Sequence, residues 1–190
     1  SRMRLLPAGF AFALVALVAA CDDPNQLADA TIPNVVDTVT ISALEGTPVT
    51  SPSAFSVADS RPVRTDLTSA FDFAYNVDAT TQHVFLTLEV LGLSNTSGSG
   101  PGLQHTGSTF DEITRAPSSG WVTNDTVPVA VGDVLYARSR IVCSNLGVPL
   151  YGKLEVLSID DAQGVRTITF QVLTNTNCGY RGLEPGIPSE

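Results

Sequence analysis

The chain has 190 residues and a formal net charge of −9, from 19 acidic and 10 basic side chains. This excess of carboxylates repels nucleic acid and anionic lipid head groups, which argues against a nucleic-acid-binding protein. The acidity is more simply a source of solubility. Hydrophobic residues make up 43% of the chain, enough for one domain to bury a core.

The first 20 residues have the pattern of a secretory signal. Arg2 and Arg4 precede an almost wholly apolar run from 5 to 20, and two alanines stand directly before Cys21. A cysteine at the cleavage point resembles the lipobox of bacterial lipoproteins, so we expect Cys21 to be acylated with palmitate-like chains. The alternative is an uncleaved anchor, although this run of 16 residues is shorter than the roughly 20 that span a bilayer.

This signal predicts the localisation and the domain organisation. Residues 1–20 would be a cleaved signal peptide, and 21–33 an acidic tether with two prolines and little periodicity. Residues 34–190 would form a single β-domain, lipid-anchored to a bacterial membrane and facing the periplasm or the cell exterior. The loss of Arg2 and Arg4 would take the net charge from −9 to −11, because two positive charges are removed.

Two further cysteines, Cys143 and Cys178, remain in the mature chain. Disulfides persist in compartments outside the cytoplasm, so an exported chain with two such residues is expected to bridge them. Two buried free thiols are the alternative.

The first half of the domain has mainly the period-two alternation of β-strands. It predicts a half-buried strand at 38–43, short edge pieces at 55–57 and 63, and a hairpin of strands 71–77 and 83–91. Residues 92–107 are rich in Gly, Ser, Thr and Asn and predict a long loop. The capping-box pattern from Thr109 to Glu112 predicts one short helix.

The last third predicts a three-strand meander at 134–142, 151–159 and 166–174. Because successive strands run in opposite directions, Cys143 and Cys178 should lie at the same end of the sheet, as a disulfide requires. The fold class is therefore all-β, an antiparallel sandwich or a barrel-like domain.

Enzyme signatures are missing from the sequence. It contains no G-x-S-x-G, H-E-x-x-H, phosphate-loop or C-x-x-C motif, and two histidines are too few for a three-histidine metal site. The carboxylates that come closest to forming pairs are expected on solvated faces and in turns: Asp72, Asp78, Asp160 and Asp161. The protein is therefore predicted to be non-enzymatic.

The two histidines carry the candidate ligand chemistry. His83 begins a predicted strand and His105 lies in the glycine-rich segment, so two imidazoles from different elements could hold a haem iron from both sides. The alternative is two rim histidines without a ligand.

Several stretches in the right order resemble the HmuY-like haem-binding lipoproteins of Gram-negative bacteria, over roughly residues 68–175. The matching stretches are 71–75 (F-D-F-A-Y), 99–102 (S-G-P-G), 110–117 (F-D-E-I-T-R-A-P), 132–139 (G-D-V-L-Y-A-R-S), 151–156 (Y-G-K-L-E-V) and 167–172 (T-I-T-F-Q-V).

The resemblance implies an all-β fold, a lipid anchor and haem held by two axial side chains, which here would be His83 and His105. Arg115, Arg138 and Arg140 would be the cations for the haem propionates. The chain departs from the family pattern in having Phe71 where the family has tryptophan, and in its extra cysteine pair.

We therefore expect a membrane-anchored, non-enzymatic β-domain that binds a ligand, with haem as one version. The alternative is a structural or accessory subunit that docks on a larger membrane protein complex through the 92–107 loop and Trp121. An enzyme is a third reading, for which the sequence offers no motif.

Overall fold

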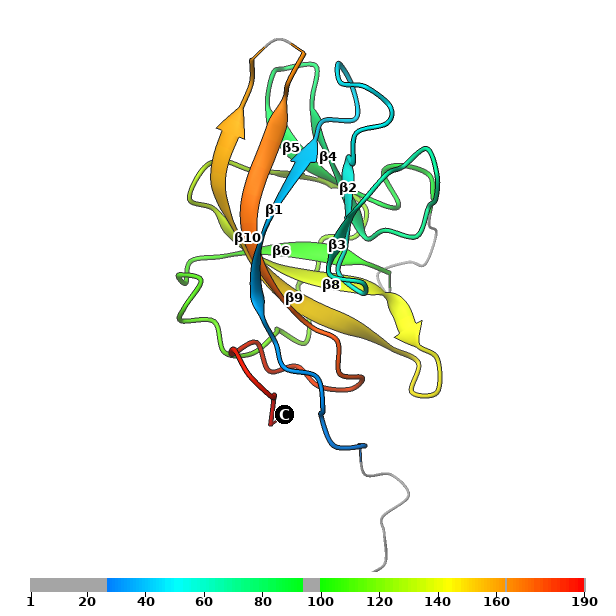
Figure 1. Ribbon diagram of the computed structural model, residues 1–190, viewed down its shortest axis with the longest axis vertical. Coiled ribbons are helices and arrows are strands. Elements are labelled where there is room, and N and C mark those ends of the chain that lie inside the picture. The colour runs from blue at the N-terminus through cyan, green and yellow to red at the C-terminus, as the bar shows by residue number, and fades with distance from the viewer. Residues whose placement is uncertain (1–26, 94–99, 163, 190) are drawn as a thin grey trace, which may run out of the picture.

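The computed structural model describes residues 27–93, 100–162 and 164–189, which form ten strands in two antiparallel five-stranded sheets (Figure 1). The first sheet contains, in spatial order, β1 (Val36–Ser42), β10 (Thr167–Asn175), β9 (Val148–Asp160), β8 (Val134–Cys143) and β6 (Gly102–Thr106). The second contains β3 (Arg61–Val63), β2 (Ala54–Ser56), β4 (Phe73–Val77), β5 (His83–Thr87) and β7 (Thr126–Pro128). The all-β prediction is confirmed. Because the two sheets remain separate and do not close, the domain is sandwich-like and not a barrel.

The alternation of side chains along the strands produces the core between the sheets. Four phenylalanines meet there, with ring centroids 5.7 Å apart for Phe55 and Phe73, 4.8 Å for Phe73 and Phe85, and 5.5 Å for Phe55 and Phe170. Phe170 belongs to the first sheet, and the other three phenylalanines belong to strands of the second sheet. Edge-on and tilted contacts of this kind add to the free energy of burying the rings, so this cluster holds the two sheets together.

The two predicted supersecondary motifs are both present. β8, β9 and β10 form the meander, and β4 pairs with β5 as an antiparallel hairpin. β5 is shorter than the alternation indicates, because the chain turns after Thr87: the amide of Leu91 donates to its carbonyl at 3.2 Å.

The short helix predicted from Thr109 is wrong, and the described residues contain no helix. Half of the capping box forms, since the Thr109 amide donates to the Glu112 carboxylate at 2.8 Å. The carbonyls of Phe110 and Ile113 instead accept hydrogen bonds from Lys153 Nζ, at 2.7 and 2.9 Å. A helix needs such carbonyls for amides four residues on, so these lysine contacts favour a turn.

Lys153, the single lysine of the chain, is buried on the outer face of the first sheet. Its ammonium lies 4.4 Å from the centroid of the Phe110 ring, and burial lowers the pKa of this group. The lysine therefore ties the 110–113 turn down over β9, where that segment covers a second apolar cluster: Phe110, Ile113, Ala116, Val134, Leu173 and Leu183.

The expectation of a loop throughout 92–107 is also wrong, because Gly102–Thr106 forms β6 at the edge of the first sheet. Residues 94–99 lie outside the described part of the chain. Gly102 is required by its surroundings, since a Cβ there would come within 2.8 Å of the Val122 carbonyl oxygen. The glycine content of this strand therefore reflects close backbone packing rather than a loop.

Asp72 was expected on a solvated face, and this is wrong: its side chain is fully buried, with the residue 2% exposed. Oδ2 accepts the amide of Val57 at 2.7 Å, and Oδ1 accepts the amide of Arg140 at 2.7 Å and lies 3.3 Å from the Arg140 guanidinium. Burial raises the pKa of Asp72, while Arg140 and the amides act in the opposite direction. This carboxylate is a polar link between the two sheets.

We expect Asp72→Ala to lower the free energy of unfolding by about 3 kcal/mol, because the buried amides and the Arg140 guanidinium lose their acceptor. Chemical denaturation of the oxidised domain measures this. Asp37→Ala is the matched control, because Asp37 is exposed on β1, and it should cost less than about 0.5 kcal/mol. Equal losses in the two variants would contradict the assigned role.

Candidate functional site

The sandwich has two ends, which the longest strand, β9, connects. Val148 pairs with Cys143 at one end and Asp160 pairs with Thr167 at the other, and a strand of this length spans roughly 40 Å. We call them the disulfide end, marked by Cys143, and the histidine end, marked by His83. Figure 1 shows the β9–β10 turn at the top and the β8–β9 hairpin at the bottom, beside the N-terminal segment.

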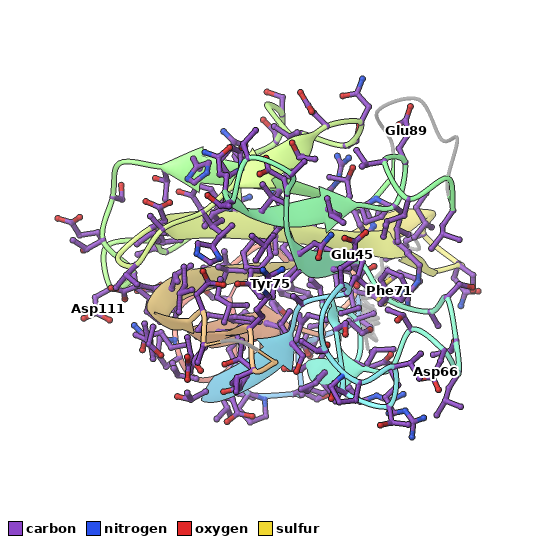
Figure 2. The ribbon with its side chains drawn as sticks, turned by 90° about the horizontal axis from the view of Figure 1, so that it is seen from above. Glu45, Asp66, Phe71, Tyr75, Glu89 and Asp111 are labelled. Carbon is purple, nitrogen blue, oxygen red and sulfur yellow. A yellow bond between two sulfur atoms is a disulfide. The ribbon has the colours of Figure 1, made fainter. Side chains whose placement is uncertain are left out.

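Tyr75 lies inside the histidine end and is completely buried. Figure 2 looks down on the molecule from above and labels this residue near the middle of the view. Burial raises the pKa of Tyr75 to about 12, and the nearby negative charge of Asp161 adds to this, whereas Arg166 opposes it. The phenol is therefore a neutral hydrogen-bonding group at any physiological pH.

His83 occupies a core-facing position at the start of β5, directly opposite Val77, and is half-buried. Its Nδ1 lies 2.8 Å from the Tyr75 hydroxyl, and the two rings are stacked with centroids 6.1 Å apart. When Nδ1–H donates to the tyrosine oxygen, Nε2 retains the lone pair that a metal needs. Tyr75 thus fixes the direction of a histidine that can serve as a ligand.

His105 lies near the end of β6, opposite Leu135, and is exposed. Its Nε2 lies 2.8 Å from the carbonyl oxygen of Pro128, and since a carbonyl only accepts, Nε2 carries the hydrogen. In the neutral ring Nδ1 then holds the lone pair.

The two histidines come from opposite sheets and both contact the end of β7. The amide of Val129 donates to the His83 carbonyl at 2.9 Å, while Pro128 accepts from His105. Nε2 of His83 could therefore bind a metal. His105 could do so only through Nδ1, or through Nε2 after its hydrogen bond to Pro128 opens.

The remaining predicted carboxylates do serve as turn residues. Asp78 accepts from the amide and hydroxyl of Thr80 at 2.8 and 2.7 Å and from the amide of Gln82 at 2.9 Å. Asp160 accepts the Ala162 amide at 2.9 Å. Within the described ranges, no three His, Cys, Asp or Glu side chains come together as a metal-binding group.

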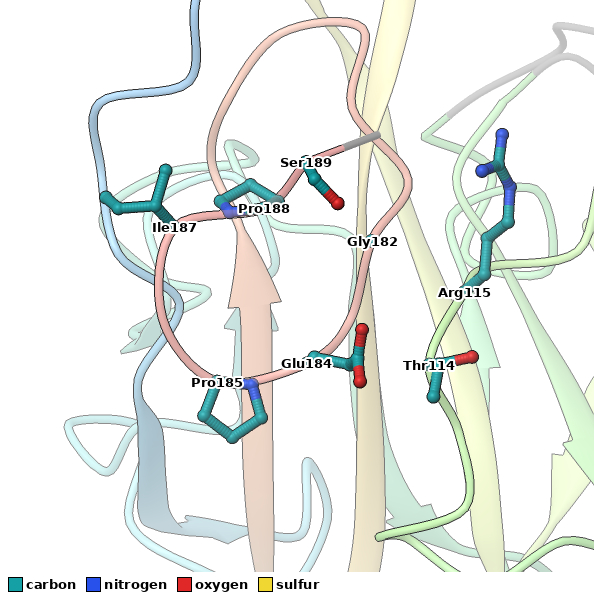
Figure 3. A pocket seen from close by; sticks show the side chains of 8 residues that line it. All are labelled: Thr114, Arg115, Gly182, Glu184, Pro185, Ile187, Pro188 and Ser189. Carbon is teal, nitrogen blue, oxygen red and sulfur yellow. The ribbon is translucent and has the colours of Figure 1, made fainter.

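The three arginines expected to face propionates lie elsewhere. Arg140 contacts Asp72, and Arg138 donates to the Gly100 carbonyl at 3.0 Å and lies opposite Tyr151, toward the disulfide end of β9. Arg115 lines a polar cavity of about 320 Å³, together with Thr114 and the 182–189 segment (Figure 3). Propionate pairing by these residues at the histidine end is therefore not supported.

The cation at the histidine end is Arg166, which the sequence reasoning did not single out. Its guanidinium lies 3.6 Å from Asp161, and its charge acts on Tyr75. Tyr75 was not singled out either, although the hairpin register places it two pairs from His83 on the same strand face. Its position in that register was the available signal.

Trp121, expected at a contact surface, is half-exposed in a row of aromatic and cationic side chains. Its ring lies 5.1 Å from the Arg138 guanidinium and 5.9 Å from the Tyr151 ring, and Arg181 lies 5.6 Å from Tyr151 on the far side. Such stacking holds the indole in place on the surface of the first sheet.

The disulfide end contains the predicted Cys143–Cys178 bridge, with Cα atoms 5.7 Å apart. Beside it is a mainly apolar cavity of about 400 Å³, lined by Leu27, Ala28, residues 142–146 and Cys178. Cys21 and the signal segment lie outside the described residues. In the part of the chain that the structure describes, no helix is long and apolar enough to cross a membrane.

No family model matches the chain, and no curated protein matches it. The likeness to HmuY-like lipoproteins therefore remains a prediction from the residues quoted above.

Breaking the disulfide should destabilise the domain. The cysteines are 35 residues apart, so the Cys143→Ser/Cys178→Ser variant should unfold with a free energy about 3–4 kcal/mol lower, by the chain-entropy estimate. Urea denaturation with and without reductant measures this. The wild type should fall to the level of the variant when reduced, and a stability that does not respond to reductant would contradict the bridge.

Proposed function

We propose that this protein is a non-enzymatic, lipid-anchored domain that binds a ligand outside the bacterial cytoplasm. The observation that carries the proposal is the placement of the two ends. The described chain enters beside Cys178, since Leu27 and Ala28 line the cavity at the disulfide end, whereas His83 lies at the other end and His105 lies level with the middle of β9. A domain tethered at the disulfide end presents the histidine end away from its anchor.

The disulfide supports export, because such bonds persist in oxidising compartments. It also agrees with the lipobox at Cys21, which would place the domain on the outer side of a membrane.

The ligand class that the histidine end fits best is a haem-like iron porphyrin. His83 would bind the iron through Nε2, with Tyr75 holding Nδ1, and His105 would approach from the other sheet. Bound haem supplies a ferric or ferrous iron that accepts imidazole nitrogen. The chain's own contribution is to orient the imidazoles beside β7 and to place Arg166 at the same end.

A second candidate is an accessory subunit of a larger membrane complex. The row formed by Arg138, Trp121, Tyr151 and Arg181 favours it, because half-exposed tryptophan and arginine are typical anchors of protein interfaces. This surface is on the outer face of the first sheet and does not involve the histidines.

The anchor can be tested by mass spectrometry of the native protein from bacterial membranes. We expect a chain that begins at Cys21 and carries fatty acyl mass, and Cys21→Ser should move the protein into the soluble fraction. A product that keeps residues 1–20 and has no acyl adduct would overturn the anchor.

The ligand can be tested by titrating haem into the domain and following the Soret band. We expect a shifted band with the wild type, its loss in His83→Ala, and affinity weaker by roughly tenfold in Tyr75→Phe, which removes the hydroxyl at Nδ1. Gln82→Ala, next to His83 and exposed, is the matched control and should bind like the wild type. A wild type with no Soret shift, or a shift unchanged in His83→Ala/His105→Ala, rules out this ligand.

A further inference from the structure

The disulfide end carries an exposed apolar surface that the proposed ligand site does not use. Four side chains form this surface, which we call the anchor-side patch: Leu27 (39% exposed), Ile141 (51%), Val142 (39%) and Leu146 (49%). Leu27 belongs to the entering chain, and the other three to the tip of the β8–β9 hairpin, which the disulfide joins to the segment after β10.

The entering chain is held firmly against this end of the domain. Asn177 accepts the amides of Thr31 and Ile32 through Oδ1, each at 3.0 Å, and the Tyr180 hydroxyl donates to the Ala28 carbonyl at 3.2 Å. Leu27 also packs on Gly179, where a Cβ would come within 2.5 Å of its side chain. The point at which the chain leaves the domain is therefore fixed beside Cys178.

The distance from this point to the lipid-bearing cysteine is short. Six steps along the chain separate Leu27 from Cys21, and even a fully extended segment of that length spans only about 20 Å. Acyl chains on Cys21 would therefore hold the anchor-side patch within about 20 Å of the bilayer surface.

The charge distribution also fits a membrane as the partner of the anchor-side patch. The two sequence stretches that carry the disulfide, 134–154 and 162–183, contain no Asp or Glu, although the chain has 19 acidic residues. They contain five cations, of which Arg166 lies at the histidine end and Lys153 is buried: Arg138, Arg140, Lys153, Arg166 and Arg181. Asp29 is the acidic residue of the described entering segment. An anionic membrane would repel most of this protein's surface and repel the hairpin tip least.

We infer that the anchor-side patch docks on the bilayer leaflet that holds the Cys21 acyl chains, with the β8–β9 hairpin tip in the interfacial layer. This rests on the lipid anchor proposed above. Partially inserted aliphatic side chains and an acyl anchor act as two signals, and together they fix the orientation of the domain as well as its location.

The test uses the mature acylated protein in phosphatidylethanolamine–phosphatidylglycerol vesicles. In a Trp121→Phe background the sole tryptophan is removed, and Leu146→Trp then places one indole in the patch. Val165→Trp is the matched control, because Val165 is also exposed (45%) but lies in the β9–β10 turn at the histidine end. Lipids brominated on their acyl chains quench only an indole that reaches the hydrocarbon boundary.

We expect emission from position 146 to shift to the blue and to be quenched several-fold more than emission from position 165. Equal quenching at the two positions would overturn the docking. A blue shift at position 146 that bromine does not quench and that grows with protein density would also overturn it, in favour of contact between two copies. Protein that fails to float with the vesicles marks a failure of the anchor itself, and mass spectrometry of Cys21 separates these cases.

Hydrogen exchange on the unsubstituted acylated chain gives an independent reading if a tryptophan variant folds poorly. Amides of the 141–147 tip should exchange roughly tenfold more slowly in vesicles than in detergent-free soluble Cys21→Ser protein, since docking removes them from water. Amides of the 78–82 turn at the histidine end should be unchanged. Protection at neither site, in protein shown to be acylated and vesicle-bound, would contradict the docking.

Discussion

The buried carboxylate of Asp72 links the two sheets through hydrogen bonds, in addition to the phenylalanine cluster that packs between them. It accepts amides from Val57, after β2, and from Arg140, in β8, so it joins both sheets through backbone groups. The ladder between β8 and β9 is interrupted between Arg138 and Ile141, because the Arg140 amide bonds to Asp72 rather than to β9. Bulges bend a strand and redirect its side chains, so this contact aims the hairpin tip that carries Cys143.

The same arrangement separates the chemistry of the two ends. At the disulfide end the tip exposes aliphatic side chains, and Asn177 and Tyr180 hold the entering chain to it. At the histidine end a buried phenol orients His83, with Asp161 and Arg166 nearby. The strand β9 runs from one end to the other, so a ligand proposed for the histidine end would not compete with a bilayer proposed for the disulfide end.

Much of the fold was accessible from the sequence because period-two alternation has few alternative explanations. It identified the β8–β10 meander, the β4–β5 hairpin and therefore the disulfide. The three wrong predictions, of a helix, a loop and a solvated carboxylate, have a common cause: each depends on contacts between residues that are distant in sequence. Lys153 takes carbonyls that a helix after Thr109 would use, and residues 102–106 form a strand because they pair with β8. Asp72 is buried where it accepts the Arg140 amide. Local patterns carry no information on such partners. The Tyr75–His83 contact was accessible in principle, because the hairpin register alone places the two residues two pairs apart on the same face.

If the protein is anchored as proposed, its orientation on the membrane would determine what the histidine end can meet. A tether of 13 residues alone, from 21 to 33, would let the domain tumble and would bring either end to the surface. The contacts of Asn177 with Thr31 and Ile32 shorten the free part of that tether and attach it at one edge. If the anchor-side patch then rests on the lipid, β9 raises His83 by roughly 40 Å, well beyond the Debye length of an anionic surface at physiological salt. The strongly acidic remainder of the domain opposes the reverse orientation, so the charge of the chain and its apolar tip favour the same direction.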